Sequence, residues 1–134
     1  LRDKLQAIRK ALLTLHKSIL EAERTCYERR HGRIESPHAL LQLLMNDPWF
    51  GWFRPLSEIL VRIDETLEAG GRPKPGSPAP TEYNDAPAES IIRELRSLLQ
   101  PAEQGEEFPV RYHAILQEAP DIILSHAEMS QLLN

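Results

Sequence analysis

Three side chains in the N-terminal segment have the chemistry to bind a metal ion or a polar ligand together. His16, Glu23 and Tyr27 fall on one flank of an expected helix over residues 2–31. An imidazole, a carboxylate and a phenol could reach a metal or polar ligand, or the carboxylate could fix the imidazole tautomer and raise its pKa. The simpler alternative is a histidine at the core boundary, with its nitrogens satisfied by neighbouring groups or water.

A second histidine near the C-terminus could complete such a site. His126 lies on the apolar face of an expected helix, which favours a packed histidine over a ligand. If His16 and His126 meet in space, the two imidazoles and the Glu23 carboxylate could hold a metal ion or a small ligand. Trp49 and Trp52 would then form the walls of that pocket.

Known metal and catalytic patterns are incomplete in this chain. Di-iron bundles use two Glu-x-x-His motifs, and Glu28 with His31 matches one of them. Glu35 and His38 have the same spacing, but Ser36-Pro37 lies between them and starts a new helix, so the two side chains do not share a helix face. No Gly-x-Ser-x-Gly or phosphate-binding loop is present. The single cysteine, Cys26, lies on the expected inner stripe, which indicates a buried structural role. We therefore predict no catalytic residue, no metal ligand set and no cofactor.

An aromatic block provides the other candidate surface. Trp49, Phe50, Trp52 and Phe53 make up half of the aromatic residues of the chain. Trp49, Trp52 and Phe53 share a helix face with Leu56, which predicts core packing, whereas Phe50 points away and is expected to be exposed. The alternative is that the block stacks on a flat ligand or anchors a partner protein.

The elements that position these residues are all expected to be helices. After the helix at 2–31, Ser36-Pro37 predicts a short helix at 38–46, apolar nearly all round and therefore expected to lie between other elements. Pro55 predicts a kink near 51–55 in a helix at 48–69, or a break into two pieces. Further helices are expected as follows: 86–99, 109–119 and from 120 onwards.

Together these patterns predict an all-α fold: one domain over 1–134, an antiparallel helical bundle of about four main helices with short capping helices. Residues 70–87, rich in proline and glycine, are expected to be a long linker. Glu58 and Arg62 are expected to pair on an outer face.

Composition excludes several function classes. A net charge of −4 argues against nucleic-acid binding, which requires a basic surface. Apolar runs are too short to span a membrane. A lone cysteine and no recognisable signal peptide favour a cytoplasmic protein. The one local basic patch could receive an acidic partner or a phosphate, or be a solvated helix end; it comprises Arg24, Arg29, Arg30, His31 and Arg33.

The first half of the chain resembles a family of small uncharacterised bacterial proteins. The resemblance is carried by these segments: Leu15-His16-Lys17, Glu23-Arg24, Tyr27-Glu28-Arg29, His31-Gly32, Leu40-Leu41-Gln42-Leu43-Leu44 and Asp47-Pro48-Trp49-Phe50-Gly51-Trp52-Phe53-Arg54-Pro55-Leu56-Ser57. It implies a bacterial protein and brings no activity with it.

The expected function is therefore a non-enzymatic module that binds a partner protein or associates with itself, with a homodimer as one form. Its expected surface is the Trp49 to Phe53 region and the flank of the first helix. The alternative is a bundle that binds a metal or a small ligand through His16, Glu23, Tyr27 and His126.

Overall fold

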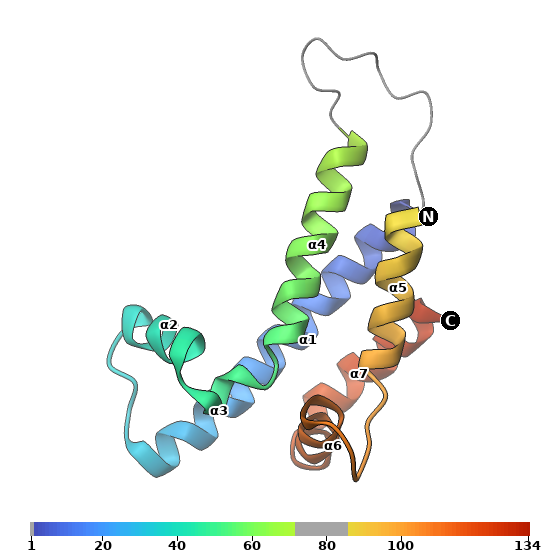
Figure 1. Cartoon of the computed structure of the whole chain (residues 1–134). Coiled ribbons are helices and arrows are strands. Elements are labelled where there is room, and N and C mark those ends of the chain that lie inside the picture. The colour runs from blue at the N-terminus through green and yellow to red at the C-terminus, as the bar shows by residue number, and fades with distance from the viewer. Residues whose placement is uncertain (1, 72–85) are drawn as a thin grey trace.

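The computed structural model describes residues 2–71 and 86–134, and the side chains of all of these except 69–71. The regular elements of the described chain are all helices, with no strand, which confirms the predicted fold class (Figure 1). The arrangement as an antiparallel bundle in one domain stays a prediction. The helices are α1 (Arg2–His31), α2 (Pro37–Asn46), α3 (Pro48–Gly51), α4 (Arg54–Gly71), α5 (Ala86–Leu98), α6 (Glu107–Glu118) and α7 (Pro120–Leu133).

Helix α1 is the central element of the fold. It packs against α3, α4, α5 and α7. The residues of its inner stripe are fully buried: Leu5, Ile8, Leu12, Leu15 and Ile19. Gly32 ends the helix with a φ of +89°, a left-handed conformation that glycine adopts without steric cost. The predicted span of this helix is confirmed.

Side-chain caps start the next two helices where the sequence predicts. The Ser36 hydroxyl accepts a hydrogen bond from the Ala39 amide at 3.0 Å, and Pro37 occupies the first turn of α2. The Asp47 carboxylate accepts from the Trp49 amide at 2.9 Å at the start of α3. These caps satisfy amides that have no partner within their own helix.

The expected helix at 48–69 is broken rather than kinked. Helix α3 ends at Gly51, and α4 begins at Arg54 after a turn at Trp52 and Phe53. Pro55 explains the break, because its ring would clash with the carbonyl of Gly51 in a continuous helix. In the structure Pro55 lies in the first turn of α4, where a proline is tolerated.

Helix α2 differs most from its prediction. It was expected to be enclosed, yet none of its residues is buried. Leu41 is 50% exposed and Met45 is 60% exposed. Figure 1 shows α2 at one side of the molecule, away from α5, α6 and α7. Leu40, Leu43 and Leu44 pack against the core on its inner side. Within the described residues its extensive helix contacts are with α3 alone, which leaves Leu41 and Met45 on an outer face that these residues do not cover.

The remaining helices close one hydrophobic cluster over α1. Every helix of the described chain except α2 contributes buried side chains to this cluster.

Polar side chains link the helices at the surface. Arg62 of α4 donates to Glu94 of α5 at 2.5 Å, so the predicted Glu58–Arg62 pairing is wrong: Arg62 reaches across to the neighbouring helix instead. Arg96 of α5 donates from Nε to the Leu133 carbonyl at 3.0 Å, which satisfies one carbonyl at the C-terminal end of α7.

The predicted linker at 70–87 is shorter than expected at both ends. Helix α4 extends to Gly71 and α5 starts at Ala86, so only the outer residues of that range are placed in helices. Residues 72–85, the rest of the predicted linker, lie outside the described chain. None of the helices in the described parts has both the length and the apolar character to cross a membrane.

Candidate functional site

The aromatic block is mostly core. Trp52 is 3% exposed and Phe53 is 2% exposed, as predicted for the inner face. Phe50 is 1% exposed, so its predicted exposure is wrong. The break after Gly51 gives the physical reason: α3 does not continue the rotation of α4, and Phe50 turns towards the Tyr27 ring of α1, 5.4 Å away between centroids.

Trp49 is the one half-buried member of the block and lies beside the end of α1. Its ring meets the rings of Tyr27 and His31 edge to face, each at 5.7 Å between centroids. The Arg30 guanidinium lies over the Trp49 ring at 5.8 Å from its centroid, a cation–π contact. The ring contacts of Tyr27 are therefore with His31, Trp49 and Phe50, and His16 is not among them.

The basic patch at the end of α1 is not an open array of cations. Arg24 donates to the Glu28 carboxylate at 3.0 Å, and Arg30 lies over Trp49. The second carboxylate oxygen of Glu28 accepts from the Ile34 amide at 3.3 Å, which fixes the chain after Gly32.

His16 is held in a contact between two helices. Its Nε2 lies 2.7 Å from the Ser57 hydroxyl of α4, and its ring meets the Phe53 ring edge to face at 5.5 Å. Burial lowers the pKa of His16, because it disfavours the charged imidazolium. The alternative in which Glu23 raises the pKa of His16 is therefore wrong.

His126 has its own partner on α6. Its Nδ1 lies 2.6 Å from the buried Tyr112 hydroxyl, and burial lowers the pKa of His126. Burial also raises the pKa of the Tyr112 phenol, which stays protonated and able to donate. His16 and His126 are thus bound by separate partners, and the predicted two-histidine constellation is not seen. Within the described chain, no three His, Cys, Asp or Glu side chains are grouped to hold a metal ion.

Glu23 is the predicted site residue with the most unusual surroundings. It is half-buried, and burial raises the pKa of its carboxyl. Arg111 of α6 and the indole N–H groups of Trp52 and Trp49 act in the opposite direction, while the negative charge of Glu118 adds to the rise. Both indole N–H groups are buried, and within the described chain neither meets the distance and angle of an ordinary hydrogen bond.

A cavity of about 660 Å³ opens beside Glu23 between α1, the start of α3 and α6. We call it the Glu23 cavity. Its wall contains charged, aromatic and apolar residues, namely Glu23, Cys26, Arg30, Asp47, Pro48, Trp49, Arg111, Ala114, Ile115 and Glu118. Cys26 is half-buried at this wall rather than enclosed in the core, which corrects the expectation of a purely structural thiol.

Arg111 and Glu118 are site residues that sequence reasoning missed. They lie seven positions apart on α6, with Ala114 and Ile115 between them, and so share one helix face. That spacing was visible in the sequence. The packing of this face opposite Glu23 depends on contacts far apart in the chain, which periodicity does not give.

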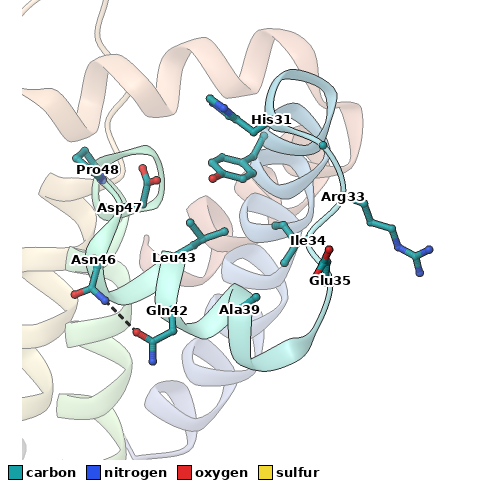
Figure 2. A pocket seen from close by; sticks show the side chains of 12 residues that line it. His31, Arg33, Ile34, Glu35, Ala39, Gln42, Leu43, Asn46, Asp47 and Pro48 are labelled. Atoms are coloured by element: carbon teal, nitrogen blue, oxygen red, sulfur yellow. Dashed lines mark hydrogen bonds between the residues drawn. The ribbon is translucent and has the colours of Figure 1, made fainter.

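A second cavity of about 650 Å³ lies between the end of α1 and α2 (Figure 2). Figure 2 shows His31 on one side of it and Leu43 and Gln42 of α2 on another, with Asn46 donating to Gln42 at 3.3 Å. Arg33 points away from it. This cavity borders the uncovered helix α2 and its wall is formed partly by the segment that follows Gly32.

Comparison with known proteins finds no family model, no curated protein and no solved structure that matches this chain.

Proposed function

We propose that the protein is a non-catalytic helical interaction module that binds through the uncovered face of α2. The observation that carries this proposal is the exposure of Leu41 and Met45, one helical turn apart, on a helix with no buried residue. Exposed apolar side chains that share a stripe mark sites of protein association. The proposal moves the expected surface from the aromatic block to its neighbour, because Phe50, Trp52 and Phe53 are in the core.

The occupant that best fits this face is a second copy of the same helix. Helix α2 contains no aspartate, glutamate, lysine or arginine, so two copies can approach without opposing like charges. A twofold axis through an antiparallel helix pair would bring Leu41 of one copy against Met45 of the other. The face is that of a ten-residue helix, which is small beside the roughly 800 Å² per partner of stable complexes. We therefore expect a weak, reversible dimer, with a Kd on the order of 10–100 µM.

Sedimentation velocity on the whole chain tests this association. The native protein should shift from monomer to dimer as its concentration rises through roughly 1–500 µM. The double variant Leu41→Gln and Met45→Gln should stay monomeric over that range, because it removes the apolar stripe and leaves the core untouched.

Val61→Gln provides the matched control. Val61 is 55% exposed on α4, so the substitution changes an equally accessible apolar residue elsewhere on the surface. This control should dimerise like the native protein. A native protein that stays monomeric throughout would refute self-association. A dimer that persists in the double variant would show that α2 is not the interface.

A small-ligand protein is the second candidate function, favoured by the Glu23 cavity. Of the expected ligand-binding set it would keep Glu23 and Trp49, while His16 and His126 are engaged elsewhere. For either function we propose a cytoplasmic protein of bacterial origin. The support is the single cysteine and the resemblance of the segment at 47–57.

A further inference from the structure

The Glu23 cavity has the size of a small-molecule site. Its volume of about 660 Å³ falls within the roughly 300–1,000 Å³ typical of ligand pockets. Three separate segments of the chain form its wall: α1, the junction of α2 with α3, and α6. A ligand bound here would contact residues that lie far apart in the sequence.

Two buried indole N–H donors beside Glu23 lack a hydrogen-bond acceptor at ordinary distance and angle within the described chain. Trp52 is 3% exposed, and its indole N–H makes no hydrogen bond of full geometry in the described chain. The N–H of Trp49 is in the same state. Both act on the Glu23 carboxylate, so they are directed towards the residue that lines the cavity. Buried N–H groups without partners destabilise a fold, which makes the indole N–H of Trp49, the one of the two residues that lines this cavity, informative.

The charges around the cavity are of both signs and are not paired with one another. Glu23, Asp47 and Glu118 contribute carboxylates, while Arg111 and Arg30 contribute guanidinium groups. The ion pairs within the described chain join Arg9 to Asp64, Arg24 to Glu28 and Arg62 to Glu94, so none of them involves these five residues. A wall with separated positive and negative groups is complementary to a ligand that carries both charges.

The rest of the wall is apolar. Ala114 and Ile115 of α6 and Pro48 of α3 supply aliphatic surface, and Trp49 supplies an aromatic ring. Such surface suits a compact apolar group attached to the charged part of a ligand.

We propose that the Glu23 cavity binds a small zwitterion, a free α-amino acid with an apolar side chain. Its ammonium group faces Glu23 and its carboxylate faces Arg111, while the side chain packs against Ile115 and Pro48. Burial removes water from the Glu23 carboxylate, and the ammonium group of the ligand would stabilise that negative charge. This inference rests on the second candidate function and is independent of α2.

Three probes, L-leucine, L-methionine and L-phenylalanine, test the proposal with the whole chain. Trp49 and Cys26 line this cavity, and the chain has one other tryptophan, Trp52, and no other cysteine, so the protein carries its own reporters there. At millimolar concentration, at least one probe should shift the tryptophan emission and slow the alkylation of Cys26.

Analogues that lack one of the two charges test the zwitterion directly. For L-leucine, these analogues are L-leucinamide, which lacks the carboxylate, and 4-methylpentanoate, which lacks the ammonium. The corresponding amide and deaminated acid serve if another probe binds. Each analogue should bind at least about tenfold more weakly than the amino acid from which it is derived.

Charge variants place the ligand in the cavity. Glu23→Gln and Arg111→Met should each weaken binding by about tenfold or more, whereas Glu103→Gln and Arg33→Met, at exposed positions away from the cavity, should leave it unchanged. Arg111 is exposed on α6, so Arg111→Met still tests the site if circular dichroism shows that Glu23→Gln is unfolded.

The ways in which the proposal can fail are distinguishable. If no probe and no analogue binds at millimolar concentration, the small-ligand function itself is refuted. If the amide or the deaminated acid binds as tightly as the amino acid, the cavity binds ligands but the zwitterion assignment is wrong. Binding that survives both Glu23→Gln and Arg111→Met would place the ligand elsewhere.

Discussion

Two neighbouring stretches of this chain are both rich in large apolar residues, yet they have opposite fates. Phe50, Trp52 and Phe53 are almost completely buried, whereas α2, which ends just before them, has no buried residue. The aromatic block turns sharply at residues 52 and 53 and so directs its rings towards several helices. Within residues 2–71 and 86–134, α2 makes extensive contacts with one other helix, α3. Apolar content therefore did not decide burial here; the number of elements within reach did.

The difference has a functional meaning. A buried apolar side chain contributes to the stability of the monomer, while an exposed stripe of such side chains gains stability only when something covers it. We therefore assign a structural role to the aromatic block and a binding role to α2. Predictions that compare the two stretches can break this assignment.

The largest expected effect is on the aromatic block. Phe53→Ala should lower the free energy of unfolding by about 3–5 kcal/mol, because it leaves a cavity beneath His16 and Trp52. Leu41→Ala in α2 should change it by less than about 0.5 kcal/mol, since half of that side chain is already exposed. Urea unfolding of dilute protein followed by circular dichroism measures both. Similar losses in the two variants would end the contrast between the stretches.

A smaller effect is expected where α4 joins α1 beside the block. Ser57→Ala removes the partner of His16 Nε2 and should cost about 1 kcal/mol in the same urea assay. Ser90→Ala, at an exposed position of α5, is the control and should cost less than about 0.5 kcal/mol. Equal effects for the two serines would show that the His16–Ser57 contact does not stabilise the packing of α1 on α4.

The smallest effect, and one of opposite sign, is expected at Glu23. Burial raises the pKa of Glu23 in the folded protein above its unfolded value of 4.5. At a pH between these two pKa values the folded state binds more protons than the unfolded state, so stability falls as the pH rises through this window. The charged carboxylate therefore reduces stability above that window and has no such effect below it. Glu23→Gln should stabilise the protein at pH 7, and the gain should shrink as the pH is lowered below 4.5. Thermal unfolding at both pH values measures this difference. A variant less stable than the native protein at pH 7 would contradict the burial penalty.

Local signals in the sequence predicted much of the fold. The apolar stripe of α1, its end at Gly32, and the Ser36 and Asp47 caps all depend on residues a few positions apart. Pro55 indicated an interruption in the same way, although a full break was the weaker of the two alternatives.

Long-range packing explains the errors. Phe50 was assigned to the surface by continuing the rotation of one helix through a point where the chain turns. Helix α2 was expected to be enclosed because its composition is apolar, but composition does not show which elements lie within reach. The grouping of Arg111 and Glu118 with Glu23 joins α6 to α1 across most of the chain, and no spacing rule connects them.

Disulfide crosslinking at α2 tests the central claim most directly. In a Cys26→Ser background, Met45→Cys and Leu41→Cys proteins are mixed and oxidised mildly, with Cys26→Ser and Val61→Cys as the control. Pairing of two α2 helices predicts a covalent dimer that joins position 41 of one copy to position 45 of the other, and none above background in the control. Equal crosslinking at position 61, or none at α2 at a concentration where the native protein dimerises, would contradict the account.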